Sequence, residues 1–213
     1  MKDIAIYGFG GFGREIACVI KAINSVKPIW NIVGFFDDGV AAGTRNRYGR
    51  VLGGMETLNN WSTTLSVVFA IGSGHIIRKL TGKINNGNID FPNIIAPNVQ
   101  MFDEESFSCG RGNVITFGCR ISTDVTIGDF NVLNGCVSLG HDVKLGNYNV
   151  LFPETRISGM TEIGNDCFFG AKSFASQLLH IPDGVRLGTG AFLLKNPKSG
   201  FLYMGNPARK III

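Results

Sequence analysis

The second half of the chain carries an apolar residue at every sixth position. Stepping by six from residue 109 to residue 193 meets fifteen residues, all of them apolar: Cys109, Ile115, Ile121, Ile127, Leu133, Leu139, Leu145, Leu151, Ile157, Ile163, Phe169, Ala175, Ile181, Leu187 and Leu193. This period fits neither an α-helix, whose apolar stripe recurs every 3.6 residues, nor a simple strand with alternating faces. It predicts six-residue units, or hexads, each a short strand and a corner, three to a coil, with the apolar residues stacked inside a prism.

The residue after each apolar position is usually small, and glycine recurs there at 110, 128, 146 and 164. Because small residues accept tight bends, we expect the corners of the coil at these positions. The resulting fold is a parallel β-helix built from hexapeptide repeats. We assign a left-handed coil, which departs from the usual right-handed crossover; the spacing itself does not show the hand.

Residues 1 to about 90 follow a different pattern, in which strands and helices alternate. Apolar runs predict strands at 4–7, 32–36 and 67–71, and a helix follows Gly13 with Glu15 in its first turn. This alternation predicts a small α/β, Rossmann-like domain with a parallel sheet. Residues 45–65 are left unassigned. We divide the chain into the Rossmann-like domain at 1–92, the β-helix at 93–195 and a C-terminal segment at 196–213.

Composition excludes several classes of protein. Charged residues make up 17% of the chain and hydrophobic residues 45%, which excludes a disordered chain. No apolar run is long enough to span a membrane and the N-terminus lacks a signal peptide, so we expect no membrane insertion. The five cysteines form no CxxC pair, which favours a reducing cytoplasmic location without a zinc site or disulfides. The basic group at Arg45, Arg47 and Arg50 is too small for a nucleic-acid surface.

A glycine-rich turn joins the first strand to the first helix. Residues 8–13 read Gly-Phe-Gly-Gly-Phe-Gly, which satisfies G-x-G-x-x-G, and Asp37 and Asp38 follow the second strand. Such a turn presents backbone N–H groups and a helix N-terminus to phosphate. Taken alone it suggests an NAD-dependent oxidoreductase, yet a domain of about 90 residues lacks the second half that a dinucleotide usually spans. A packing turn that binds nothing is the structural alternative.

One histidine lies at a position suited to acid–base chemistry. His141 follows the inward Leu139 by two residues, so its side chain is expected at a corner facing outward, beside Asp142. A histidine can act as a general base near neutral pH, and an adjacent carboxylate can fix its tautomer. Gly159 lies three hexads later, one coil along, where its N–H can meet a developing oxyanion. A corner glycine with positive φ is an equally good reading of Gly159.

The hexad pattern, the glycine-rich turn and the tail at 204–210 together resemble the bacterial NeuD/PglD-type sugar acyltransferases. The resemblance covers nearly the whole chain, and its most specific parts are the turn and the run Leu-Gly-His-Asp at 139–142. It implies a Rossmann-like domain joined to a left-handed β-helix. It also implies acetyl transfer from acetyl-CoA, without a metal, to an amino or hydroxyl group of a nucleotide-linked or surface-polysaccharide sugar, in homotrimers with active sites between adjacent prisms.

The resemblance also assigns roles to residues of this chain. It makes His141 the catalytic base, with Asp142 in support and Gly159 at the oxyanion. It implies that acetyl-CoA is bound at the later coils and the tail: Gly170, Ala171, Gly188, Thr189, Gly190, Ala191 and Arg209. It implies that the sugar nucleotide is bound at the edge of the first sheet: Gly8, Gly10, Gly11, Gly13, Asp37 and Ser73.

One position departs from the family pattern. Some relatives that act on UDP-linked amino sugars have a second histidine nine residues after the base, where this chain has Val150. The identity of the sugar and nucleotide, N- or O-transfer, and acyl chain length therefore stay open. Val150 and Phe152, taken to lie near the base, also keep open a non-catalytic relative. The γ-type carbonic anhydrases share the prism but need three histidine ligands at the interface, and only His141 and His180 lie in this repeat, so we do not expect a zinc hydrolase.

The repeat also predicts where copies of the chain contact one another. An apolar column of Val132, Val150 and Phe168 recurs at every third hexad, just before the inward column. We expect this column to be exposed and to mark the contact between copies, because large exposed apolar patches usually mark interfaces. A three-sided prism suits a closed three-fold ring.

Overall fold

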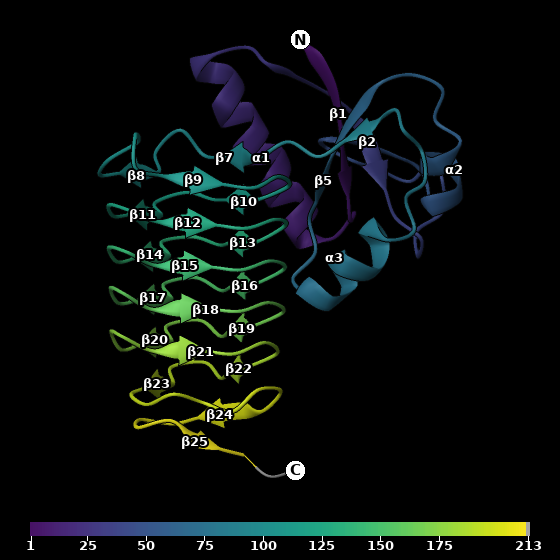
Figure 1. Ribbon diagram of the computed structural model, residues 1–213. Coiled ribbons are helices and arrows are strands. Elements are labelled where there is room, and N and C mark those ends of the chain that lie inside the picture. The colour runs from purple at the N-terminus through teal and green to yellow at the C-terminus, as the bar shows by residue number, and fades with distance from the viewer. Residues whose placement is uncertain (212–213) are drawn as a thin grey trace.

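The computed structural model describes residues 1–211, which form an α/β domain packed against one side of a three-sided prism (Figure 1). The α/β domain contains a six-stranded sheet in the order β3-β4-β2-β1-β5-β6, parallel except for the β3–β4 pair. Its strands are β1 (Lys2–Tyr7), β2 (Trp30–Phe36), β3 (Arg45–Asn46), β4 (Gly49–Gly53), β5 (Leu65–Phe69) and β6 (Ile89–Asp90). Its helices are α1 (Gly11–Val26), α2 (Met55–Asn59) and α3 (Gly74–Thr81).

The predicted strands and first helix are present, with two differences. The unassigned stretch at 45–65 forms the β3–β4 hairpin, which extends one edge of the sheet, then α2 and the first residue of β5. The first helix begins at Gly11, so Glu15 lies beyond its first turn, and that turn holds no acidic residue. The prediction for Glu15 was wrong because the helix starts inside the glycine-rich turn. The N-terminal end of α1 therefore keeps its partial positive charge without a neighbouring carboxylate in that turn.

Three faces of short strands build the prism, and the strands of each face pair in parallel from coil to coil; each has two residues except β24, which has three. The docked face, which meets the α/β domain, contains β7 (Ile94–Ile95), β10 (Val114–Ile115), β13 (Val132–Leu133), β16 (Val150–Leu151), β19 (Phe168–Phe169), β22 (Arg186–Leu187) and β24 (Leu202–Met204). The groove face contains β8 (Gln100–Met101), β11 (Arg120–Ile121), β14 (Ser138–Leu139), β17 (Arg156–Ile157), β20 (Phe174–Ala175) and β23 (Phe192–Leu193). The ladder face contains β9 (Ser108–Cys109), β12 (Thr126–Ile127), β15 (Lys144–Leu145), β18 (Glu162–Ile163) and β21 (His180–Ile181).

The coils follow the predicted period of three hexads, since Val114 pairs with Val132 and Val132 with Val150. The coil is left-handed as it descends in Figure 1. The inward column is confirmed, because every member from Ile115 to Leu193 is at most 4% exposed. The last strand, β25 (Arg209–Lys210), pairs antiparallel with β24, so the segment from 196 onward continues the docked face. The end of that segment, 212–213, lies outside the described residues.

The left-handed bends of the corners do not fall on the small residues where they were predicted. Left-handed φ angles recur every six residues at positions two residues further on, for example 58° at Asp142 and 57° at Tyr148, whereas Gly128 and Gly146 have none. These glycines are needed for coil stacking, because a Cβ on Gly128 would lie 2.7 Å from the carbonyl oxygen of Gly146. That oxygen accepts a hydrogen bond of 2.9 Å from buried Asn131. Small residues and bends share one period, so spacing alone could not separate them.

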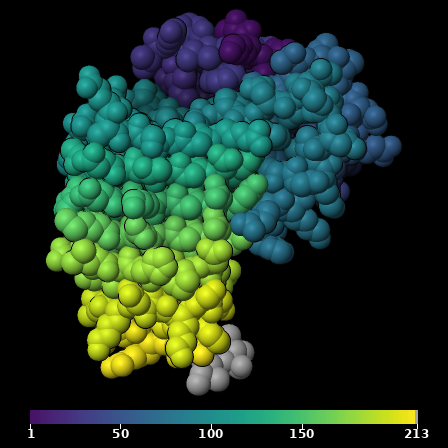
Figure 2. All heavy atoms as spheres, in the orientation of Figure 1, coloured from purple at the N-terminus to yellow at the C-terminus, as the bar shows by residue number. Residues whose placement is uncertain are grey.

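The predicted exposed column is covered by the chain itself. Val132 and Val150 are 2% and 1% exposed and belong to the same apolar cluster as the core of the α/β domain, and Phe168 packs against it. The prediction that this column marks the interface between copies was therefore wrong. Figure 2 shows the α/β domain beside the earlier coils, with the later coils extending beyond it. Among the described residues no helix has the length and apolar character needed to cross a membrane.

Candidate active site

The corner between β14 and β15 holds a histidine–carboxylate pair. His141 Nδ1 lies 2.7 Å from Asp142 Oδ2, and both side chains are 52% exposed. The left-handed backbone at Asp142, a conformation that aspartate tolerates better than most residues, allows these consecutive side chains to meet. A carboxylate beside Nδ1 favours the tautomer with its proton on Nδ1. Nε2 is then left able to accept a proton from a bound substrate.

Gly159 lies directly beneath the imidazole ring, one coil along. A Cβ at this position would lie 2.5 Å from Nε2 of His141 and 2.7 Å from its Cε1. The left-handed bend of this coil falls on Met160 and not on Gly159, so the reading of Gly159 as a corner glycine was wrong. Within residues 1–211 the Gly159 N–H donates to no protein acceptor. The glycine is required because the histidine ring occupies the space of a side chain.

Charged side chains line the ladder face next to this pair. Asp142, Lys144, Met160 and Glu162 border a hollow of about 260 Å³. Lys144 donates a 2.9 Å hydrogen bond to Glu162, which lowers the pKa of the carboxyl and raises that of the ammonium. Further along the face, His180 Nδ1 lies 3.6 Å from the other oxygen of Glu162. His141 and Asp142 therefore have an exposed, charged surface on this side.

The neighbouring face of the prism holds a groove that the sequence did not predict. The groove encloses about 720 Å³ on the groove face, and its lining includes Arg120, Ser138, Arg156, Lys172, Phe174 and Phe192. The rings of Phe174 and Phe192 lie 5.3 Å apart. Five of these six side chains recur at every third hexad, immediately before an inward position, so the outward positions of the repeat were the available signal. Glu154 also lines the groove and lies 3.8 Å from Lys172, so Arg120 and Arg156 are the cations that suit an anionic ligand, beside aromatic rings that suit its apolar segments.

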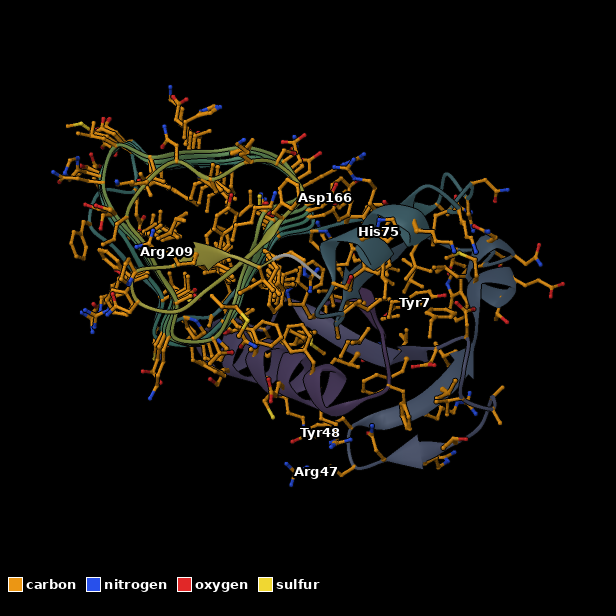
Figure 3. All side chains as sticks on the ribbon, turned by 90° about the horizontal axis from the view of Figure 1, so that it is seen from below. Tyr7, Arg47, Tyr48, His75, Asp166 and Arg209 are labelled. Atoms are coloured by element: carbon orange, nitrogen blue, oxygen red, sulfur yellow. The ribbon has the colours of Figure 1, made fainter. Side chains whose placement is uncertain are left out.

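The predicted acetyl-CoA residues come together at the last corner between the docked and groove faces. Gly170 and Ala171 stack against the next coil, where the Gly190 N–H donates to the Ala171 carbonyl at 2.8 Å and a Cβ on Gly170 would lie 2.5 Å from Thr189 N. Gly188 contacts Met204, whose β24 position pairs with Arg209 in β25. Arg209 is exposed near the end of the prism (Figure 3). Ala191 differs, because its side chain is fully buried in the core.

The glycines of the N-terminal turn divide into two kinds. A Cβ on Gly8 would lie 2.7 Å from the Ala70 carbonyl, and one on Gly13 would collide with the Gly8 carbonyl, so both are required by packing. Gly10 has open space around it, and a Cβ on Gly11 would contact only the Arg14 side chain. Packing therefore explains Gly8 and Gly13 and leaves Gly10 and Gly11 free to face a ligand.

The acidic and hydroxyl residues at this edge hold its loops. Asp37 accepts hydrogen bonds of 2.9 Å from the N–H groups of Phe9 and Gly39, and Ser73 caps α3 by accepting from Ile76 N at 3.5 Å. Tyr7 donates to Asp38 at 2.7 Å. Burial, reinforced by this carboxylate, raises the pKa of the Tyr7 hydroxyl well above its usual value, so Tyr7 stays protonated. Asp37 and Ser73 thus lie at the predicted edge and already have structural roles.

His141 and the glycine-rich turn are not brought together within one chain. The α/β domain covers the docked face (Figure 3), whereas His141 lies on the opposite edge of the prism, between the groove and ladder faces. Val150 is buried under the α/β domain on the docked face, so the expectation that it lies near the base of its own chain was wrong. Among the described residues, no group of three or more histidine, cysteine, aspartate or glutamate side chains is arranged to hold a metal ion.

The fold and this corner define a two-part class of protein, an α/β domain joined to a left-handed hexapeptide β-helix. Residues 3–84 match the PglD N-terminal domain family. The acetyltransferase domain of PglB from Neisseria gonorrhoeae FA1090, solved with acetyl coenzyme A, is 26% identical with a TM-score of 0.87, and the match covers 99% of both chains. These similarities confirm the predicted resemblance to NeuD/PglD-type acyltransferases.

Other relatives extend the comparison. WeeI from Acinetobacter baumannii AYE, at 24% identity, and PerB from Caulobacter crescentus in complex with CoA and GDP-perosamine, at 22%, share the fold with TM-scores of 0.88 and 0.87. Those matches cover 99% of this chain and 100% and 98% of the relatives. A UDP-3-O-acylglucosamine N-acyltransferase from Caulobacter sp. (strain K31) is 34% identical over 88 residues, 41% of this chain. That match spans about a quarter, 26%, of the relative's length.

Proposed function

We propose that this protein transfers an acetyl group from acetyl-CoA to an amino or hydroxyl group of a nucleotide-linked sugar. The observation that carries the proposal is the His141–Asp142 pair standing over Gly159 at an exposed corner. A glycine that leaves room for an imidazole ring at an exposed corner adds nothing to the apolar interior of the prism, whereas a general base beside a free amide suits acyl transfer. The full-length similarity to an acetyltransferase domain that binds acetyl coenzyme A supports the same reaction.

His141 is the general base in this reaction. Its Nε2 takes the proton of the acceptor amine or hydroxyl as that nitrogen or oxygen attacks the thioester carbonyl. Asp142 accepts from Nδ1–H and stabilises the imidazolium that forms. The Gly159 N–H donates to the oxyanion of the tetrahedral intermediate. When the intermediate collapses, the carbon–sulfur bond breaks and the imidazolium returns the proton to the departing CoA thiolate.

The donor lies along the late coils in this proposal. Gly170, Gly188 and Gly190 let the pantetheine arm lie close to the backbone at the corner of the docked and groove faces, and Arg209 meets a phosphate. The groove continues from this corner toward His141, since it is lined by Lys172 on one side and Ser138 on the other. Its arginines and phenylalanines then supply charge and apolar surface to the length of the cofactor.

The acceptor is held by the other domain. Gly10, Gly11 and the N-terminal end of α1 present N–H groups and positive charge to the diphosphate of the nucleotide. Because the turn and His141 lie on opposite sides of one chain, the turn of one copy serves the base of a neighbour in a homotrimer. Each active site is therefore shared between two copies. We expect the enzyme to work in the cytoplasm, where nucleotide sugars and acetyl-CoA meet.

A CoA-release assay tests this function. Wild-type protein is incubated with acetyl-CoA and a series of amino- and hydroxy-sugar nucleotides, and free thiol is measured. Release that needs a sugar nucleotide and is lost in His141→Asn, but kept in the matched exposed-histidine variant His180→Asn, is the expected result. No release with any acceptor would overturn the proposal. In a thermal-shift series, CoA should raise Tm and NAD(H) should not; the reverse would favour an oxidoreductase.

A further inference from the structure

Helix α3 contacts one corner of the prism. It begins within residues 72–74, which lie at the edge of the first sheet where the sugar nucleotide is predicted to bind and are called the acceptor edge below. In α3, Gly74 comes directly after Ser73 and abuts the main chain of Tyr148, such that a Cβ on Gly74 would collide with the Tyr148 carbonyl oxygen. Any larger residue would push the first turn of α3 off the prism. Gly72 lies one residue before the cap of α3. A Cβ added to Gly72 would lie 3.7 Å from the ring of Phe152. The edge at 72–74 is therefore in direct contact with the prism.

Polar contacts hold the rest of the helix to the same corner. Arg78 forms a 2.8 Å ion pair with Asp166, and its guanidinium lies 4.8 Å from the centre of the Tyr148 ring. Thr81 Oγ1 is 3.3 Å from the Tyr148 hydroxyl. Asp166 lies three hexads after Tyr148, one coil along the prism, so Arg78 reaches across two coils. Figure 3 shows Asp166 on the corner of the prism and His75 of α3 on the other side of this contact.

These contacts fix a height along the prism axis. Tyr148 follows His141 by seven residues and lies in the same coil, so the edge at 72–74 is held at the level of the coil that carries the base. Successive coils are about 4.8 Å apart. A three-fold axis parallel to the prism relates copies by rotation without changing height. The acceptor edge of one copy then stands at the level of the neighbour's His141.

We propose that Gly74, Tyr148 and the Arg78–Asp166 pair are positioning residues that set the axial level of the acceptor edge against the neighbouring base. This inference rests on the proposed function. A slip of one coil would exceed by far the tolerance of a reacting pair, whose atoms must approach to about 3–3.5 Å, and a displacement of about 1 Å can cost 10²-fold in rate. Apolar packing on the docked face holds the domains together, and the α3 contacts select their register.

The test compares steady-state kinetics of full-length Arg78→Gln, Asp166→Asn and the double variant. Asparagine also tolerates the left-handed backbone found at residue 166. We expect each of these single variants to lower kcat about 10-fold. A further variant, Gly74→Val, should lower kcat up to about 100-fold. The Kd of CoA, measured by calorimetry, should stay unchanged in all of them. The double variant should be no slower than either single variant, and Arg78→Lys should recover part of the rate. Lys79→Gln, on the exposed side of the same helix, is the matched control.

The outcomes separate the two proposals. Unchanged kcat in Arg78→Gln and Gly74→Val, with an active wild-type protein, would overturn the positioning role and leave the function intact. A loss of CoA affinity in parallel with kcat would also overturn it, because that points to general unfolding of the prism. A wild-type protein that releases no CoA with any sugar nucleotide would overturn the function and the inference together.

Discussion

Candidate functional residues are recognised for opposite reasons in the prism and in the α/β domain. In the prism the repeat sets every position, and we assign chemistry where an outward corner residue departs from it, as His141 does above Gly159. In the α/β domain no repeat exists, and chemistry is assigned to the glycines that packing does not require, Gly10 and Gly11. A residue in a periodic structure is informative when it breaks the period. A residue in an irregular turn is informative when packing does not require its residue type.

The largest expected effect comes from removing the base. His141→Asn keeps a polar side chain at an exposed corner and should lower kcat by about 10²- to 10⁴-fold, the usual contribution of general base catalysis. The Tm should stay unchanged, since the inward column is untouched. Steady-state CoA release and a thermal melt measure the two quantities. Turnover equal to that of His180→Asn would show that the departure from the repeat has no catalytic meaning.

A smaller change tests the space beneath the ring. Gly159→Ala places a Cβ 2.5 Å from Nε2 of His141, so the imidazole must move. Because a displacement of about 1 Å can cost 10²-fold, we expect a loss of roughly 10- to 100-fold in kcat with the CoA affinity retained. The matched control is Gly135→Ala, where a Cβ would meet nothing closer than 3.8 Å. Equal kinetics for the two variants would contradict the role given to Gly159.

A substitution in the glycine-rich turn should change the KM for the acceptor and leave the KM for the donor unchanged. Gly10→Glu adds a carboxylate to an open position at the N-terminal end of α1, where it opposes a diphosphate. We expect the KM for the sugar nucleotide to rise about 10-fold, since charge-assisted hydrogen bonds to the phosphates, about 1.5–3 kcal/mol each, are weakened. The KM for acetyl-CoA should not change. Gly87→Glu, at an equally open glycine of the same domain, controls for added charge, and an identical response from it would refute phosphate binding at the turn.

The smallest effect concerns the exposed pair on the ladder face. The pKa of Glu162 is lowered by Lys144, so the pair stabilises the fold above the ordinary pKa of the carboxyl and this stability is lost as pH falls through the lowered value. The raised pKa of Lys144 keeps its share up to strongly alkaline pH. Lys144→Met should therefore lower Tm slightly at pH 7 and leave it unchanged at pH 2, as measured by melts at both values. An equal loss at both pH values would mean that the charge pair is not the cause.

Sequence reasoning succeeded where a physical requirement repeats. An apolar side chain every six residues has one explanation, a stacked interior, and residues 115–193 obey it. The same period could not place the bends. The positions of Gly146 and Tyr148 both repeat every six residues, and only the φ angle shows which of the two carries the bend. Periodicity also could not show that Val132 and Val150 are covered, because the covering domain lies earlier in the chain and its docking leaves no trace in the spacing.

The candidate site was predicted unevenly for similar reasons. His141 and Asp142 were found because adjacent residues of that chemistry are recognisable in sequence, and the structure places them 2.7 Å apart. The groove with Arg156 and Phe174 was missed because outward positions of the repeat carry no constraint of burial. The task of Asp37 in holding the turn through Phe9 N–H was also invisible, since it depends on how two strands stand side by side.

Subunit mixing tests most directly the claim that one copy supplies the base and another the turn. The His141→Asn protein and the Gly10→Glu protein, the second with about a tenth of the wild-type rate at low acceptor concentration, are unfolded, mixed in equal amounts and refolded together. A site shared between copies is intact whenever an unaltered turn meets an unaltered histidine, so the mixture should regain about a quarter of wild-type activity, because random assembly makes each choice independently. Activity no higher than that of the two variants refolded separately would contradict the account.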